Sequence, residues 1–433
     1  MRNLILILTL FFLCHGAPAA ENEPVGQAAG LSGAAAENVP VPVPEPSPRA
    51  VERYFSGTVL WCVRMLWGLG VPAFFLFSGF SARLRDFSRR LTRHWYWALC
   101  LYFVILALLN YGLSWPLNYY QGFVRPHAYG LSNQTFEKWL ADTLKELGIV
   151  LVLGCLFLWV PYLLLRKSPG RWWLYAGLAM LPIYFFVILV EPLVVAPLFN
   201  HFGPVRDKAM EAKIVALAEK AGIHGSRVYE VDKSVDTKTA NAYVAGFMGT
   251  KRIVLWDTII AQLDERELLF VVGHEMGHYA LDHVVKGILC LWVLTMIAFY
   301  GIHLTARLLI RRFAGRFAFD SLSDMASLPL IVFLMNLFSL ALTPVGFAYS
   351  RHLEHEADRF GLEITRFNHS AATGFVKLEH TSLGYPRPGL LFTIWRASHP
   401  STADRIEFFN HYKPWESGRP SKYEEHFARE KGK

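Results

Sequence analysis

The residues best suited to chemistry are two histidines on either side of a glutamate, in the run His274-Glu275-Met276-Gly277-His278. On a helix, residues four positions apart lie on one face, so both imidazoles can reach the same ion. Imidazole nitrogens suit zinc, and a catalytic zinc keeps one position open for water. Glu275 can then take a proton from that water without binding the metal. The run therefore predicts one zinc ion per chain and a hydrolytic reaction.

Two histidines leave a third protein ligand to be identified, and His283 is one candidate. It lies five residues beyond His278, which is not the spacing of the metzincin zinc motif. That motif needs glycine and histidine where this chain has Leu281 and Val284, so it is rejected. A plain helix with two exposed histidines is the alternative to any metal site. Gly277 disfavours it, because glycine in a helix interior costs about 1 kcal/mol relative to alanine.

A stronger candidate for the third ligand is Glu354, in the run SRHLEHEAD at 350–358. Glu354 and Asp358 lie four residues apart and share a helix face. The first can bind zinc while the second accepts a hydrogen bond from a ligand imidazole and fixes its tautomer. His355 and Glu356 project to other faces and are expected to be solvated or to support the ligands. A charged helix end leaving a membrane is the alternative interpretation of this run.

The composition indicates that these residues are positioned by membrane helices. Of 433 residues, 53% are apolar and only 18% charged, whereas soluble proteins carry about a quarter charged residues. The net charge of +8 is spread in short runs beside apolar stretches, which excludes nucleic acid as the expected partner. Six apolar runs approach the ~20 residues that a helix needs to cross a bilayer: roughly 58–82, 95–113, 147–165, 172–196, 287–310 and 327–349. We predict a mainly α, polytopic membrane protein with about six or seven transmembrane helices, and the lipid bilayer as one partner.

The N-terminal part is expected to be a leader followed by a tether. Residues 1–20 combine a basic start, an apolar run and the small residues Ala17-Pro18-Ala19, which is typical of a secretory signal peptide. An uncleaved first span is the alternative. Residues 21–57 are rich in proline and alanine and are predicted to be an extended tether that buries nothing.

The spans divide the remaining chain into four parts. These are a four-span membrane domain at 58–199, an α+β insert at 200–286, two further spans at 287–349, and a C-terminal segment at 350–433. The insert has helical spacing at 210–221 and strand-like runs at 227–231, 240–247 and 252–256, the last two forming a hairpin. Asp264 and Glu267 match a capping box, which predicts the start of the helix that carries the paired histidines.

The motifs together resemble the type I CAAX prenyl endopeptidases, Ste-type integral-membrane zinc metalloproteases of the gluzincin clan. The resemblance covers about 191–410 and is carried by HEMGH, SRHLEHEAD, Pro197-Leu198-Phe199-Asn200, Asn241-Ala242-Tyr243, the run KRIVLWDT at 251–258, and Ser398-His399-Pro400 with Arg405 beyond. Two departures are a signal-like first apolar run and Ser401-Thr402 in place of a more apolar stretch.

The resemblance implies a gluzincin-like zinc-protease insert and a role for each matching residue. The implied zinc ligands are His274, His278 and Glu354, with Glu275 as general base and Asp358 orienting a ligand. The implied substrate-binding strand carries Asn241 and Ala242, a mode in which a sheet edge pairs with an extended peptide. His399 and Arg405 match positions that steady the substrate or the developing oxyanion; for His399 a structural role in a turn before Pro400 is the alternative.

The function expected from this pattern is a membrane-embedded zinc endopeptidase. Its substrate is either a C-terminal CAAX-type peptide, prenylated or not, or a membrane protein cleared by quality control. A transporter or lipid-binding membrane protein that keeps a non-catalytic zinc site is the alternative class. The glutamate at 275 disfavours it, since a non-catalytic site needs no base.

The distribution of basic residues predicts the orientation in the membrane. Basic residues are concentrated at 83–93, 166–171 and 307–316, whereas the much longer loop 114–146 holds only Arg125, Lys138 and Lys145. Loops rich in Lys and Arg are retained in the cytoplasm. Since the insert and the C-terminal segment lie at the opposite ends of the spans, they are expected on the extracytoplasmic side. The eukaryotic members of the resembled family expose the zinc domain to the cytosol, which is the opposite expectation.

Overall fold

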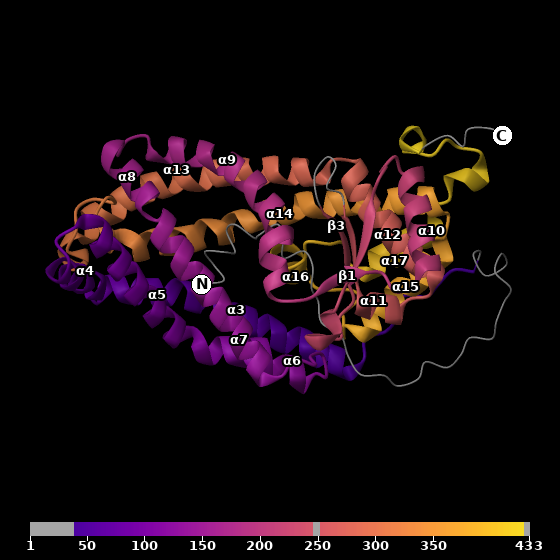
Figure 1. Ribbon diagram of the computed structural model, residues 1–433, viewed down its shortest axis with the longest axis horizontal. Helices are drawn as coiled ribbons and strands as arrows, with labels where there is room; N and C mark the ends of the chain where they lie inside the picture. Colours follow the sequence, from indigo (N-terminus) through magenta and orange to yellow (C-terminus); the bar gives the residue numbers. More distant parts are fainter. Residues whose placement is uncertain (1–38, 246–251, 428–433) are drawn as a thin grey trace.

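The computed structural model describes residues 39–245 and 252–427. Within these residues, six helices are long and apolar enough to cross a membrane, as the sequence predicted. The spans are formed by α3 (Pro48–Phe77), α5 (Trp95–Tyr119), α7 (Phe136–Phe157) continued by α8 (Trp159–Lys167), α9 (Trp172–Val190), α13 (His283–Phe317) and α14 (Leu328–Thr365). In Figure 1 they make up the elongated body, and the strands with the shorter C-terminal helices lie together at one end.

The apolar side chains of these helices face outward as well as inward. Only 6–39% of the most apolar window in each span is buried inside the protein. Phe186 and Leu308 are among the many large apolar side chains left exposed. This distribution is unfavourable in water but favourable in a bilayer, where backbone groups are satisfied within each helix and apolar surface meets lipid.

The insert is built around a small mixed sheet in the order β1-β2-β4-β3. Its strands are β1 (Phe202–Pro204), β2 (Arg227–Val231), β3 (Ala242–Ala245) and β4 (Arg252–Trp256). β2 pairs in parallel with β4, and β3 pairs antiparallel with β4, which confirms the predicted hairpin. Since β3 pairs only with β4 among the described strands, one of its edges is left open. The three-residue β1, which contains a proline, was not predicted.

Helix α12 (Glu265–Ala280) carries the paired histidines and begins as predicted. The Asp264 side chain accepts hydrogen bonds from the backbone nitrogens of Arg266 and Glu267. The Glu267 side chain in turn accepts one from the Asp264 nitrogen, which completes a capping box. α12 packs closely against α14, and glycines make the approach possible. A Cβ on Gly277 would lie 3.0 Å from Phe360 Cβ, and one on Gly361 would lie 3.0 Å from the His274 backbone nitrogen. Gly277 is therefore explained by helix packing, since larger side chains would force these helices apart.

The C-terminal segment adds three further α-helices after the last span. It contains α15 (Asn368–Thr381), α16 (Leu390–Trp395) and α17 (Thr402–His411). The other helices of the described chain are α4 (Phe80–Leu91), α6 (Arg125–Ala128), α10 (Lys208–Lys220) and α11 (Asp257–Gln262). The helix of the last span continues without a break to Thr365, so Glu354 lies on α14 itself.

The predicted leader at 1–20 lies outside the described residues, as does the part of the predicted tether at 21–38. In its described part the prediction of a tether that buries nothing is wrong. Val41 is buried, and its backbone exchanges two hydrogen bonds with the Asn410 side chain. Helix α3 already begins at Pro48, where the Ser47 hydroxyl caps the Ala50 nitrogen. Proline favours the first turn of a helix as well as extended chain, so composition alone misassigned this stretch.

Candidate active site

The structure brings together His274, His278 and Glu354, the three predicted zinc ligands. Each offers one donor atom, and these atoms all lie within 4.8 Å of one another. The Glu354 oxygens lie 3.4 Å from the Nε2 atoms of both histidines. Glu354 Oε2 is buried and has no hydrogen-bond partner. A buried carboxylate oxygen facing two imidazole nitrogens is the donor set of a zinc site, so the residues present fit this metal.

His274 is held by a charged and fully buried arm, here called the aspartate arm: Asp358 and Arg405. His274 Nδ1 lies 2.9 Å from Asp358 Oδ1, and Arg405 on α17 donates to the same oxygen. Arg405 also lies 4.1 Å from the centre of the Phe375 ring. Burial lowers the pKa of His274, but the contact with Asp358 and the negative charges of Asp358 and Glu354 outweigh it and raise the pKa to about 10. Asp358 therefore directs Nε2 toward the candidate metal position.

His278 is held by a different arm, here called the histidine arm: His283, Glu356, Lys422 and Tyr423. His278 Nδ1 lies 3.1 Å from His283 Nδ1. His283 is 3% exposed, and its Nε2 lies 3.6 Å from Glu356 Oε2. Glu356 Oε1 in turn accepts hydrogen bonds of 3.1 Å from Lys422 and Tyr423.

The contacts of the histidine arm show where His283 lies relative to the candidate ligands. His283 faces the Nδ1 atom of His278, on the side of the ring away from Glu354, so it lies behind a ligand rather than beside one. When zinc occupies Nε2 of His278, its Nδ1 carries the proton and donates to His283 Nδ1. This contact could not be predicted from the sequence, which shows only that His283 and Glu356 lie near the motifs.

A large chamber of about 890 Å³ adjoins two of the three candidate ligands, His278 and Glu354. Glu275, His278 and Glu354 line it, together with Asn241 and Tyr243 from the β3 region. Its wall also includes polar residues from the spans, such as Asn118 of α5 and Glu146 of α7. The predicted base thus faces an internal space bounded by both the membrane helices and the sheet.

The predicted substrate strand and the two further predicted residues occupy different positions. Asn241 lines the chamber, while the buried Ala242 pairs with Leu255 of β4. His399 Nε2 lies 3.4 Å from Glu354 Oε1, so it is close to the candidate metal position. Arg405 is 7% exposed and engaged with Asp358, which places it behind the ligands.

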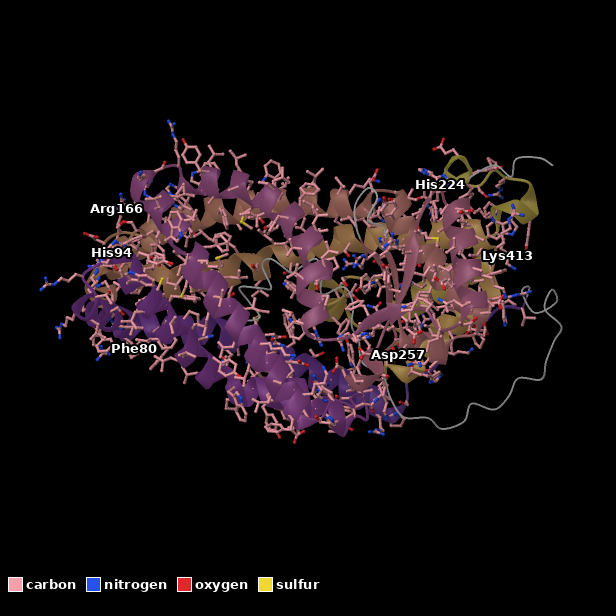
Figure 2. All side chains as sticks on the ribbon, viewed as in Figure 1. Phe80, His94, Arg166, His224, Asp257 and Lys413 are labelled. Atoms are coloured by element: carbon pink, nitrogen blue, oxygen red, sulfur yellow. The ribbon has the colours of Figure 1, made fainter. Side chains whose placement is uncertain are left out.

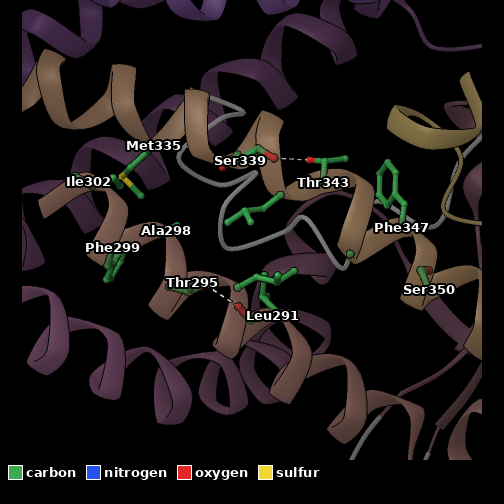
Figure 3. A pocket seen from close by; sticks show the side chains of 13 residues that line it. Leu291, Thr295, Ala298, Phe299, Ile302, Met335, Ser339, Thr343, Phe347 and Ser350 are labelled. Atoms are coloured by element: carbon green, nitrogen blue, oxygen red, sulfur yellow. Dashed lines mark hydrogen bonds between the residues drawn. The ribbon is translucent and has the colours of Figure 1, made fainter. Parts of the chain in front are cut away.

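A second, smaller cavity of about 70 Å³ lies between α13 and α14. Figure 3 shows its lining, which includes Phe299, Ile302 and Met335 at one end and Ser350 at the other. Leu291 and Ser350 line both this cavity and the chamber. The small cavity, here called the apolar slot, therefore adjoins the chamber from the membrane side.

Comparison with known proteins gives consistent matches over both parts of the chain. The model of peptidase family M48 matches residues 204–413, and that of the CAAX prenyl protease N-terminal region, five membrane helices, matches 54–201. The chain is 34% identical over 369 residues to the uncharacterized metalloprotease YhfN of Bacillus subtilis, covering 84% of this chain and 85% of that protein. It is 30% identical over 314 residues to the CAAX prenyl protease 1 homolog of Dictyostelium discoideum, covering 71% of each.

A solved structure shows the same fold. The crystal structure of S. mikatae Ste24p superposes with a TM-score of 0.70 at 22% sequence identity, covering 81% of this chain and 85% of that chain. The resemblance seen in the sequence motifs is thus confirmed by whole-chain similarity. This chain belongs to the M48 family of metallopeptidases, as a multi-pass membrane metalloendopeptidase homologous to the CAAX prenyl proteases.

Proposed function

We propose that the chain is a zinc endopeptidase whose metal is held by His274, His278 and Glu354. The observation that carries the proposal is the convergence of these three donors beside Glu275 at the wall of the chamber. When bound, zinc supplies Lewis-acid polarisation of the scissile carbonyl and makes water more acidic. A transporter with a vestigial site would have no need for a carboxylate base facing an internal space.

In this proposal Glu275 accepts the proton of the attacking water and passes it to the leaving amine. It lines the chamber, follows His274 directly in the helix, and is not one of the three converging donors. His399, close to Glu354 and half-buried, is positioned to donate a hydrogen bond to the oxygen that gains negative charge. Arg405 acts through Asp358 as a positioning residue, because its guanidinium is buried behind the ligands.

We also propose that the peptide binds along β3. The strand has one open edge, and the residues Asn241, Tyr243 and Val244 line the chamber. A sheet edge can pair with any extended backbone, so this mode sets the register of cleavage without dictating sequence. The specificity must then come from the rest of the chamber.

A substrate that carries a hydrocarbon chain is favoured by the apolar slot. The slot joins the chamber wall at Leu291 and Ser350 and is otherwise lined mainly by apolar side chains of α13 and α14. A prenylated C-terminal peptide would fit such an arrangement, and a misfolded membrane protein with an apolar segment is the second candidate substrate.

The orientation that we propose places the catalytic end outside the cytoplasm. Figure 2 shows Arg166 at one end of the molecule, with Asp257 and Lys413 at the other. The basic stretches at 83–93 and 166–171 belong to connections at the first end, away from the sheet. Under the positive-inside rule that end is cytoplasmic. A C-terminal alkaline phosphatase fusion should be active and a C-terminal green fluorescent fusion dark; the reverse pattern would contradict this orientation.

The substrate question is tested with matched peptides. Purified full-length protein is incubated with farnesylated and non-farnesylated versions of one CAAX peptide and with an unfolded membrane-protein fragment. We expect cleavage of the farnesylated peptide to be fastest, and an Ala298→Trp variant that fills the slot to lose this preference while still cleaving the plain peptide. Equal rates for all three substrates would favour the quality-control function.

A further inference from the structure

Three arginines from separate elements meet near the start of α3, and the mechanism uses none of them. They are Arg53 on α3, Arg125 on α6 and Arg396 at the end of α16. A Cβ on Gly57 would lie 3.1 Å from Arg125 Nη2 and 3.5 Å from Arg396 Nη2. The absence of a side chain at Gly57 therefore lets two guanidinium groups reach the same part of the α3 backbone.

The arginine cluster is held together by neutral acceptors. Arg125 donates to the Arg53 carbonyl oxygen and to the Ser56 hydroxyl, at 2.8 and 3.2 Å. Arg396 donates to the Thr58 hydroxyl at 2.7 Å, and Arg53 to a backbone carbonyl on the other side. These bonds fix the positions of the guanidinium groups but leave their charges uncompensated.

No carboxylate within the described ranges 39–245 and 252–427 forms an ion pair with any of the three. Two acidic side chains lie nearby: Glu52 accepts from Tyr129, and Glu379 accepts from Thr402 while lying close enough for its charge to stabilise the Arg53 guanidinium. Arg53 Nε is buried without a hydrogen-bond partner. Three half-buried cations that share the charge of Glu379 without a direct ion pair repel one another, and an anion with several oxygens would both offset that repulsion and accept the free N–H groups.

The surroundings of the cluster indicate what kind of anion would reach it. Phe55 and Val59 on α3 are 59% and 64% exposed, and Leu390 and Leu391 on α16 are 75% and 48% exposed. Arg53 lies five residues after the first residue of α3, at the end of this span nearer the catalytic insert (Figure 1). Cations at the end of a span beside outward-facing apolar side chains match the phosphate and acyl chains of a lipid at the membrane surface.

Burial supports the same interpretation. Burial lowers the pKa of Arg396, and the neighbouring Arg125 lowers it further. Arginine nevertheless stays charged in proteins, so the cost of placing these groups together must be offset by a ligand rather than by loss of a proton.

We propose that Arg53, Arg125 and Arg396 form a binding site for the phosphate of an anionic membrane phospholipid. The acyl chains would lie along Phe55 and Val59, outside the chamber. Because Arg396 is three residues before His399, a bound lipid would also hold the segment that leads from α16 to the catalytic centre. The proposal does not depend on the proposed proteolytic function, since lipid binding is measured directly.

The test is native mass spectrometry of the full-length protein, released from bilayers that contain phosphatidylcholine and phosphatidylglycerol. We expect the wild type to retain phosphatidylglycerol over phosphatidylcholine. The variant Arg53→Gln/Arg125→Gln/Arg396→Gln should lose about tenfold or more in that retention, since each arginine near a lipid surface is worth ~1 kcal/mol. The matched control removes three exposed basic residues of the catalytic end, as Lys208→Gln/Arg227→Gln/Arg419→Gln, and should behave as the wild type.

Two further measurements distinguish specific binding of the lipid phosphate by the guanidinium groups from general attraction to positive charge. The corresponding triple lysine variant keeps the charge but loses the forked donors, so an intermediate loss is expected. Arg396→Gln alone is used if the triple variant does not fold. Equal phosphatidylglycerol retention by the wild type and the glutamine variants would overturn the proposal, and so would full displacement of the lipid by inorganic phosphate, which would identify a site for soluble anions.

Discussion

The two histidines of the candidate metal centre are held by arms of different chemistry. The aspartate arm behind His274 is charged and buried: Asp358 is fully buried and bonded to Arg405. The histidine arm behind His278 runs through the neutral ring of His283 to Glu356, and ends on the exposed Lys422 and the buried Tyr423. A carboxylate makes an imidazole a stronger ligand than a neutral acceptor does. The first histidine is therefore fixed electrostatically and the second mainly by geometry.

The largest effect should come from breaking the aspartate arm. In Asp358→Ala the His274 ring loses its acceptor, and zinc affinity should fall by roughly 10–100-fold. The buried Arg405 is also left without its partner, which costs about 3–5 kcal/mol of stability. Zinc titration with a competing chelator and urea unfolding measure the two effects. The double variant Asp358→Ala/Arg405→Met should recover stability but not zinc affinity; recovery of both would mean that Asp358 acts only through folding.

A smaller effect is expected when the histidine arm is broken. His283→Gln keeps an acceptor near His278 but not its fixed direction, so zinc affinity should fall by about tenfold, the low end of such losses. The same titration measures it, with Glu354→Ala as the comparison that removes a ligand outright. If His283→Gln released all zinc while Glu354→Ala retained it, His283 would be the third ligand and the assignment of Glu354 would be wrong.

The smallest effect belongs to the outer end of the histidine arm. Tyr423→Phe removes one of the two hydrogen bonds to Glu356 Oε1 and leaves the one from Lys422. The loss of one such bond is worth about 1 kcal/mol, or a few-fold in zinc affinity at most. Tyr412→Phe, which removes a hydroxyl bonded to Glu363 instead, is the matched control. A larger loss in Tyr423→Phe than in His283→Gln would contradict the order of contacts described for this arm.

The parts of the site that the sequence predicted are those fixed by helix periodicity. His274 and His278 share a face because they are four residues apart, and Glu354 and Asp358 do so for the same reason. The capping box at Asp264 placed the start of α12 correctly. The packing of α12 against α14 then brings the two pairs together, and this contact depends on Gly277 and Gly361, which helix periodicity does not single out.

The parts that the sequence did not predict depend on irregular backbone or on distant segments. His283 reaches His278 because Asp282, between the two helices, adopts a left-handed conformation with φ 54°. No periodic pattern extends across such a residue. The contacts of Glu356 with Lys422 and of Thr58 with Arg396 join positions far apart in the chain. Residues 48–57 of the expected tether were misassigned because proline is also common in the first turn of a helix.

The central claim is that Glu275 is the base of a zinc-dependent hydrolysis and is not a ligand. The most direct test is to measure zinc content and peptide cleavage on the same preparation of Glu275→Gln, beside the wild type. We expect one zinc per chain in both proteins and a loss of cleavage by at least about two orders of magnitude in the variant. Cleavage retained at the wild-type rate, or zinc lost together with activity, would contradict it.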